Sequence, residues 1–272
     1  RMMLNMLSKD GGSVLWNNAP LSTDNCNVGY LAEERGLYPK YSLMDQLIYF
    51  AAIRGVSRED AKKRIMDWAE RLQVVEYLES KKVGKKKEKP KTADQLSKGN
   101  QQKIQFMAAL LSDPELIILD EPLSGLDPVN TDMIRSILRE EIEKDKYLIM
   151  SSHQMSTVEE FCTDITILHR SKAVLQGNLN EIKKSYGRVH LHLKTEEDAK
   201  PFINSFGIAI NSEKAHEYEL TVTGEEQANA LLISLLNNKV TIITFELREP
   251  SLHELFVKTV GDEALGVVHE EK

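Results

Sequence analysis

Leu116-Ile117-Ile118-Leu119-Asp120-Glu121-Pro122 is the stretch of this chain that indicates its fold most directly. Four consecutive apolar residues are typical of a strand that is buried on both faces of a parallel sheet. Asp120 and Glu121 then follow at the carboxyl end of that strand, where open α/β sheets place their ligands. A strand that simply ends in solvated acids would look the same, so its surroundings decide the interpretation.

The residues on both sides of this strand repeat a strand–helix rhythm. Downstream, Asp127 is expected to cap a helix that begins at Pro128. Leu148-Ile149-Met150 is a second short apolar run, and we expect it to be another strand buried on both faces. Upstream, the segment from Leu96 to Lys103 opens a helix with an apolar face made of Ile104, Met107, Leu110 and Leu111. This alternation predicts a βαβ arrangement.

Side chains suited to phosphate chemistry surround this unit. Ser97 and Gly99 stand at a helix N-terminus, which offers a hydroxyl, free N–H groups and a positive dipole end to phosphate. Asp120 is the kind of oxygen ligand that Mg²⁺ prefers, and Glu121 could orient or deprotonate an attacking water. His153 follows the next predicted strand, from where an imidazole can reach a terminal phosphate.

Taken together, four segments resemble the signature, Walker B, D-loop and H-loop motifs of the ABC ATPases. They are, in that order, Leu96-Ser97-Lys98-Gly99-Asn100-Gln101-Gln102-Lys103, Leu116 to Pro122, Ser124-Gly125-Leu126-Asp127 and Ser151-Ser152-His153. Arg1 to Trp16 is similar to the helix after the family's P-loop and to the strand that follows it. Gly29 to Pro39 resembles the Q-loop region of the sodium-efflux and drug-export type. The block after Gly187 resembles the accessory domain of such subunits.

This resemblance implies an α/β fold of the P-loop NTPase type, with a parallel sheet and a helical subdomain at about residues 40–112. The ATPase domain is expected to span residues 1–186, and a smaller accessory domain residues 187–272. The order of elements expected after Gly187 is βαββαβ, with one weak strand near Ile208, and it starts with the alternating run Val189-His190-Leu191-His192-Leu193. That order suggests a small α+β ferredoxin-like domain.

The resemblance also implies roles for individual residues, with ATP and Mg²⁺ as cofactors. Glu121 would be the catalytic base, and His153 would contact the γ-phosphate. Asp120 would act on Mg²⁺, and so would Glu33, which replaces the usual Q-loop glutamine. Contacts to ATP are expected mainly from Ser97, Lys98, Gly99, Asn100, Gln101 and Asp127. Ser97 and Gly99 would bind ATP held by an opposite subunit, and Asp127 would couple the two sites.

Three departures from the family pattern stand out. Glu33 replaces a glutamine, and Lys98 adds a positive charge where the family has glycine. The third concerns the P-loop, because no G-x-x-x-x-G-K-[ST] segment occurs in the 272 residues. We expect that loop to lie just before Arg1, so that the complete protein is an ATPase whereas this chain without the loop is inactive.

Composition and charge limit the possible partners. The net charge of −7 argues against a nucleic-acid binder, which usually carries a basic excess. Two cysteines make a disulfide framework improbable and point to a reducing compartment. The run Leu47 to Ile53 is far shorter than the roughly 20 residues that span a bilayer. The resemblance then implies a peripheral subunit on the cytoplasmic face of the cell membrane. Its partners would be a membrane-spanning permease subunit and a second ATP-binding subunit, identical or different.

Two other hypotheses remain open beside an exporter subunit. One is a soluble ABC ATPase that acts on ribosomes or DNA, although ribosomal relatives usually carry two cassettes and DNA-repair relatives carry long coiled coils. The other is a degenerate, non-hydrolysing scaffold subunit, which the intact acids and histidine speak against. The lysine-rich segment at 81–91 is either a solvated insertion or a contact with acidic lipid headgroups.

Overall fold

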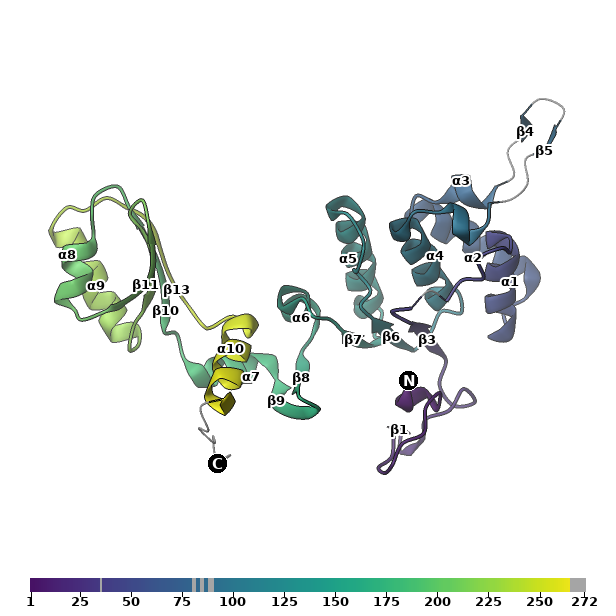
Figure 1. Cartoon of the computed structure of the whole chain (residues 1–272), viewed down its shortest axis with the longest axis horizontal. Coiled ribbons are helices and arrows are strands. Elements are labelled where there is room, and N and C mark those ends of the chain that lie inside the picture. The colour runs from purple at the N-terminus through teal and green to yellow at the C-terminus, as the bar shows by residue number, and fades with distance from the viewer. Residues whose placement is uncertain (35, 80–81, 84–85, 88–90, 265–272) are drawn as a thin grey trace. The chain divides into compact units, whose positions relative to one another are not determined.

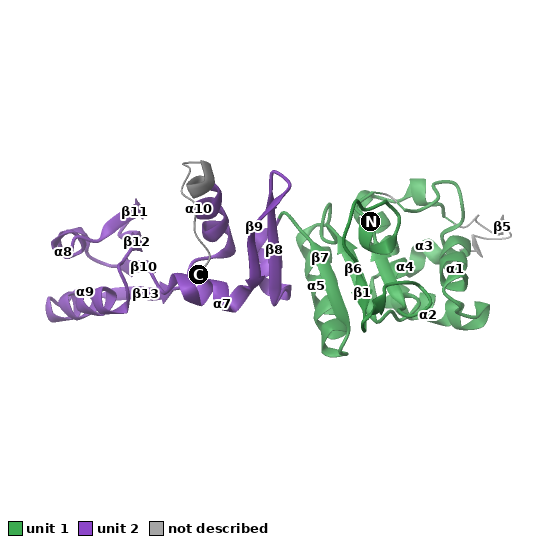
Figure 2. Cartoon of the chain, turned by 90° about the horizontal axis from the view of Figure 1, so that it is seen from below, with its two compact units in different colours: residues 1–153 green, residues 154–272 purple. Residues whose placement is uncertain are grey.

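The computed structural model describes residues 1–264, except for residues 35, 80–81, 84–85 and 88–90 (Figure 1). The chain forms two compact units, residues 1–153 and residues 154–272 (Figure 2). Of the lysine-rich segment 81–91, the structure describes only Lys91 and the short antiparallel strands β4 (Lys82–Val83) and β5 (Lys86–Lys87). A contact between this segment and lipid headgroups therefore stays a prediction.

A three-stranded parallel sheet forms the centre of the first unit, in the order β3 (Val28–Leu31), β6 (Leu116–Asp120) and β7 (Tyr147–Ser151). Strand β6 is the middle strand, and its side chains are mostly buried. Helix α5 (Pro128–Glu143) connects β6 to β7, as the predicted βαβ arrangement requires. Asp120 pairs in register with Ser151, so β6 and β7 end at the same edge of the sheet.

The prediction that both apolar strands are buried on both faces is wrong for β7. Tyr147 is 64% exposed and Ile149 is 42% exposed. Strand β7 lies at the edge of the described sheet, where only β6 pairs with it. An apolar run shows that a strand is hydrophobic, but its burial depends on neighbours that the local sequence does not contain.

The first residues form less helix than the family resemblance implies. A single 3₁₀ turn, η1 (Met2–Leu4), ends at Asn5, whose φ of 56° is left-handed. A small hairpin follows, made of β1 (Leu15–Trp16) and β2 (Ala19–Pro20). The ring of Trp16 meets that of Tyr147 edge-on, with centroids 5.1 Å apart. This aromatic contact joins the hairpin to strand β7.

Helices fill the region where a helical subdomain was predicted. They are α1 (Leu43–Ile53), α2 (Arg58–Arg71), α3 (Val75–Leu78), the 3₁₀ turn η2 (Ala93–Gln95) and α4 (Lys98–Leu110). The cap predicted at Asp127 is confirmed, because its side chain accepts a hydrogen bond from the N–H of Asn130 at 3.1 Å. Ser57 caps α2 in the same way, with a bond of 3.1 Å from the N–H of Asp60. Gly29 of β3 lets α4 approach closely, since a Cβ there would lie 2.3 Å from the carbonyl oxygen of Ala109.

The second unit begins with α6 (Met155–Phe161), the hairpin β8 (Asp164–His169) and β9 (Lys172–Asn178), and α7 (Leu179–Tyr186). The predicted βαββαβ order follows. Its elements are β10 (His190–Thr195), α8 (Lys200–Ser205), β11 (Ala209–Lys214), β12 (Glu217–Thr221), α9 (Glu225–Asn237) and β13 (Ile242–Arg248). The strands form one antiparallel sheet in the order β11-β12-β10-β13. The weak strand expected near Ile208 is β11.

Helix α10 (Leu252–Ala264) returns to the start of the second unit. Its Leu252 is fully buried in a cluster with Ile165, Ile167 and Leu179. Its Glu254 accepts hydrogen bonds from both Nη atoms of Arg248, at 2.7 and 3.0 Å. The Arg248 guanidinium, helped by the N–H of Ser251, lowers the pKa of Glu254 to about 2. An ionised carboxylate therefore fixes the helix to the end of β13.

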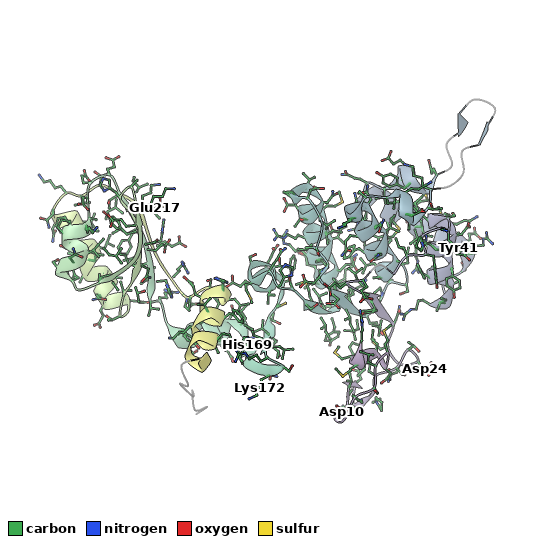
Figure 3. The ribbon with its side chains drawn as sticks, in the orientation of Figure 1. Asp10, Asp24, Tyr41, His169, Lys172 and Glu217 are labelled. Atoms are coloured by element: carbon green, nitrogen blue, oxygen red, sulfur yellow. The ribbon has the colours of Figure 1, made fainter. Side chains whose placement is uncertain are left out.

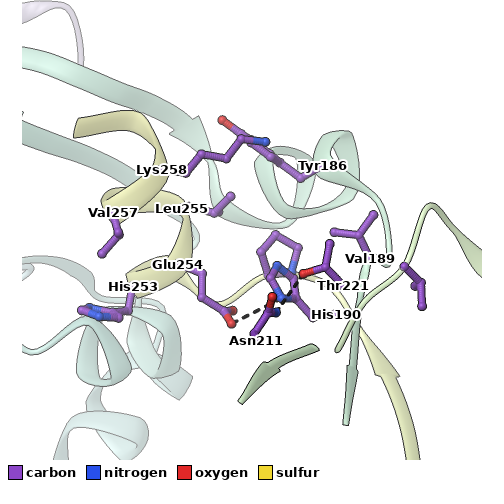
Figure 4. A pocket seen from close by; sticks show the side chains of 12 residues that line it. Tyr186, Val189, His190, Asn211, Thr221, His253, Glu254, Leu255, Val257 and Lys258 are labelled. Carbon is purple, nitrogen blue, oxygen red and sulfur yellow. Dashed lines mark hydrogen bonds and ion pairs between the residues drawn. The ribbon is translucent and has the colours of Figure 1, made fainter. Parts of the chain in front are cut away.

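A hollow of about 680 Å³ lies beside this helix (Figure 4). Apolar residues such as Val189, Val222 and Leu255 line it together with His190, Glu254 and Lys258. None of the predicted site residues lines this hollow. Size alone would nominate it as a ligand site, but Glu254, the acid in its lining, is already paired with Arg248.

The boundary predicted at residue 186 differs from the division by contacts, which falls after residue 153. We expect residues 187–272 to fold separately and to contribute nothing to an ATP site. The buried cluster from Leu191 to Val240 is self-contained, which supports a separate fold. The complete protein shortened to end near Ser185 should still bind nucleotide, with circular dichroism as the control for folding. Loss of binding by a folded truncated protein would contradict the prediction.

Candidate functional site

The predicted acids and histidine meet at one edge of the first unit's sheet. Asp120 is the last residue of β6, Glu121 follows it, and His153 comes two residues after the end of β7. The hydroxyl of Ser151 donates a hydrogen bond to a carboxylate oxygen of Asp120. The parallel register thus places three predicted site residues side by side, although 32 positions separate Glu121 from His153.

Glu121 and His153 are in direct contact. The Nδ1 atom of His153 lies 2.8 Å from Oε1 of Glu121, and the backbone N–H of His153 donates to the same oxygen at 2.8 Å. The side chain of Glu121 is only 17% exposed, whereas that of His153 is 72% exposed. The carboxylate is therefore held in one direction at the bottom of the site, and the imidazole faces solvent.

The backbone at Glu121 adopts an unusual conformation. Its φ is 47°, in the left-handed region that residues other than glycine seldom occupy. The N–H of Glu121 donates to the carbonyl oxygen of Ser151 at 3.2 Å, and Ser124 donates to the carbonyl of Glu121 at 3.1 Å. The amide of Gln102 on α4 donates to the next carbonyl, that of Pro122, at 3.1 Å. These bonds hold a turn that directs the acidic side chain into the site.

A hollow of about 140 Å³ joins the predicted metal, base and signature residues. Glu33, Lys98 and Glu121 all line it, and its remaining walls are Gln101, Gln102, Gln105, Ser124 and Gly125. Lys98 is the first residue of α4, so its positive charge and the N-terminus of the helix stand beside two carboxylates. Glu33 and Lys98, which both depart from the family pattern, thus line the same hollow.

The remaining signature residues are partly committed to the protein itself. The hydroxyl of Ser97 accepts a hydrogen bond from the N–H of Asn100 at 3.3 Å and caps α4. Gln101 is buried, and its amide donates to the carbonyl oxygens of Ala93 and Leu96 at 2.8 and 3.1 Å. The amide of Asn100 donates to the hydroxyl of Tyr77 at 3.0 Å. Contacts of these residues and of Gly99 with ATP stay predictions.

Asp127 stands at the N-terminus of α5. The backbone N–H of Asn130 and then the amide of its side chain donate to the Asp127 carboxylate, and they lower the pKa of that group. The carboxylate therefore remains ionised at neutral pH while it caps the helix. Its predicted role between two subunits stays a prediction.

Three residues at this edge were not predicted from the sequence as site residues, namely Gln102, Lys103 and Ser151. Lys103 is only 4% exposed, and its Nζ donates to Oδ1 of Asn130 at 3.1 Å. A signal was present, because Lys103 shares a helix face with Met107 and Leu110 at spacings of four and seven. A lysine on an apolar face indicates a specific polar partner.

The donor set at the edge fits Mg²⁺ bound together with phosphate. Among the residues that the structure describes, no group of three or more His, Cys, Asp or Glu is placed to hold a metal alone. Mg²⁺ usually takes one or two carboxylates and completes its shell with substrate phosphates and waters. Asp120, oriented by Ser151, supplies such a carboxylate, and Glu33 lies on the wall of the adjoining hollow.

Comparison with known proteins assigns the family. The ABC transporter family matches residues 1–124, and the family of DrrA1-3-like ATP-binding protein C-terminal domains matches residues 177–260. The uncharacterized ABC transporter ATP-binding protein YhaQ of Bacillus subtilis is 40% identical over 96% of this chain and 84% of its own length. A similar uncharacterized protein of Alkalihalophilus pseudofirmus is 37% identical over 96% of this chain and 94% of its own length. A solved ATP-binding subunit of an ABC transporter has a TM-score of 0.58 at 24% identity, over 68% of this chain and 74% of that one.

The fold and the edge residues thus define an α/β nucleotide-binding domain of the ABC type. The chain belongs to the ATP-binding proteins of ABC transporters. The predicted family, its C-terminal accessory domain and the predicted fold class are confirmed. Proteins of this family bind ATP, typically with Mg²⁺, and energise a transporter whose permease components lie in the membrane. No helix in the described part of the chain could span a bilayer.

Proposed function

We propose that this chain belongs to an exporter subunit that hydrolyses Mg-ATP between two ATP-binding subunits on the cytoplasmic face of the membrane. The observation that carries the proposal is the contact between Glu121 and His153 beside Asp120. This arrangement suits a water-activating base more than a scaffold, because a site without chemistry has no need of a half-buried carboxylate held in one direction.

Each residue at the edge has a separate task in this proposal. Bound Mg-ATP supplies the phosphoryl group to be cleaved and a cation that offsets its charge. Asp120 would hold the metal, with Glu33 as a second oxygen ligand. Glu121 would orient the attacking water and accept its proton at a carboxylate oxygen. His153 would keep that carboxylate in place and offer its outer nitrogen to the terminal phosphate.

The same proposal assigns Ser97, Lys98 and Gly99 to the nucleotide of the opposite subunit. The N-terminus of α4 provides free N–H groups and a positive dipole end, and Lys98 adds a full charge. A terminal phosphate carries the complementary negative charge. A second ATP-binding subunit, identical or different, would therefore complete each site.

Exposed aromatic residues support a protein partner for the first unit. Tyr41 is 66% exposed (Figure 3), and Tyr49 on α1 is 53% exposed. The rings of Tyr38 and Tyr41 meet edge-on, with centroids 5.7 Å apart. Aromatic side chains are enriched where proteins bind one another. This cluster begins inside the Q-loop segment, at Tyr38, so a permease subunit bound there would contact residues that follow Glu33 closely along the chain.

Co-purification from cells distinguishes this function from its alternative, a soluble ATPase that acts on ribosomes or DNA. We expect the complete, tagged protein to be recovered from detergent-solubilised membranes with an integral membrane protein in near-equal amount. Replacement of both Tyr41 and Tyr49 by serine should reduce that recovery, whereas the exposed exchange Lys63→Ser should not. Recovery with ribosomes or nucleic acid from the soluble fraction, and none with a membrane protein, would contradict the proposal.

A further inference from the structure

We propose that Lys103 is a positioning residue, which ties helix α4 to the N-terminus of α5 and thereby fixes Asp127 relative to the signature segment. The inference rests on the proposed function only where it assumes that Asp127 couples the two ATP sites. The arrangement itself is a property of the first unit and can be measured without nucleotide.

A continuous set of polar contacts connects the two helices. The ammonium of Lys103 donates to Oδ1 of Asn130 at 3.1 Å. Asn130 in turn donates its backbone N–H, at 3.1 Å, and its side-chain amide to the carboxylate of Asp127. The orientation of the Asn130 amide is thereby fixed at both ends, because its oxygen accepts from Lys103 while its nitrogen donates to Asp127.

The neighbouring residue strengthens the connection. Gln102 donates to the carbonyl oxygen of Pro122 at 3.1 Å. Gln102 and Lys103 therefore join one turn of α4 to both ends of the segment that runs from the acids after β6 to the start of α5. Gly99 at the start of α4 lies against the same segment, since a Cβ there would be 3.4 Å from the carbonyl oxygen of Gly125. The signature segment and the D-loop are thus held together within one chain.

Stability alone does not explain a lysine at this place. Lys103 is 4% exposed, and its ammonium donates a hydrogen bond to a neutral amide, not to a carboxylate. Burial lowers the pKa of Lys103, and the charges of Asp127 and Glu76 offset only part of that effect. An apolar side chain of similar volume would avoid this desolvation, and such replacements are often neutral or stabilising. The benefit of Lys103 is therefore orientation, in which the cation fixes the Asn130 amide that donates to Asp127.

Hydrogen exchange on the 272-residue chain tests this role. In Lys103→Met, the backbone N–H groups of Asn130 and Thr131, which donate to Asp127, should exchange about ten- to a hundredfold faster, because a hydrogen bond to a charged group is lost. Amides of α2 and β6 should keep their rates, and the midpoint of thermal unfolding should not fall. Lys103→Arg keeps the charge and its donors, and it should restore slow exchange. The matched control is Lys63→Met, a substitution at an exposed position on α2.

Two results would overturn the inference. Unchanged exchange at Asn130 and Thr131 would show that Lys103 does not order the start of α5. Faster exchange throughout the first unit, with a lower unfolding midpoint, would show that Lys103 is an ordinary packing residue. Neither result would affect the proposed ATPase function, which is tested through Glu121 in the complete protein.

Discussion

Glu121→Gln in the complete protein should abolish steady-state ATP hydrolysis and leave ATP binding intact. The carboxylate is 17% exposed and is fixed by the imidazole and the backbone N–H of His153. An amide of the same shape can keep the hydrogen bond from that N–H, but it cannot take a proton from water. Loss of a general base costs about 10²- to 10⁴-fold in rate. Phosphate release over time gives the rate, and nucleotide titration gives the affinity.

Glu143→Gln is the matched control for this exchange, because Glu143 is an exposed acid at the far end of α5. It should leave turnover unchanged. Near-normal turnover of Glu121→Gln would mean that another group activates the water. Loss of nucleotide binding together with activity would instead mean that Glu121 supports the structure of the site.

The 272-residue chain should bind Mg-ATP weakly or not at all, because its sequence contains no G-x-x-x-x-G-K-[ST] segment. In this enzyme class that loop surrounds the phosphates with backbone N–H groups and a lysine. Hydrogen bonds to charged groups contribute roughly 1.5–3 kcal/mol each. Loss of three such bonds weakens binding by at least about a thousandfold. Ser97 and Gly99 cannot compensate, since in our proposal they reach nucleotide that the opposite subunit already holds.

Titration calorimetry of Mg-ATP into this chain measures the effect. The same titration into a relative that contains a G-x-x-x-x-G-K-[ST] segment is the positive control. A dissociation constant in the micromolar range for the 272-residue chain would contradict the prediction. It would show that the inference about the P-loop, or the assignment of the site residues, is wrong.

Those features of the fold that depend on local sequence could be predicted. The apolar run before Asp120 is strand β6, and Asp127 with Pro128 begins α5, because a cap and a proline act on their own helix. The alternation that starts at Val189 correctly indicated the antiparallel sheet of the second unit. The family motifs indicated which segments form the site and in which order, and hydrophobic periodicity alone does not give this information.

Features that depend on distant residues could not be predicted. The exposure of Tyr147 and Ile149 follows from the edge position of β7, not from their apolar character. The contact between Glu121 and His153 arises from the register of two strands. Helix α10 packs against Ile165 and Leu179, on the other side of the boundary predicted at residue 186. That boundary was predicted from motifs and from a change in the hydrophobic pattern.

The left-handed backbone at Glu121 creates a trade-off at a single position. A glycine would adopt φ of 47° without steric cost, whereas a residue with a Cβ costs of order 1–3 kcal/mol there. Folding alone therefore favours a residue without a side chain, and hydrolysis needs a carboxylate at that point. Substitutions selected only for thermal stability would tend to replace Glu121 and so remove the base. A screen for stabilised variants of the complete protein should hold this residue constant.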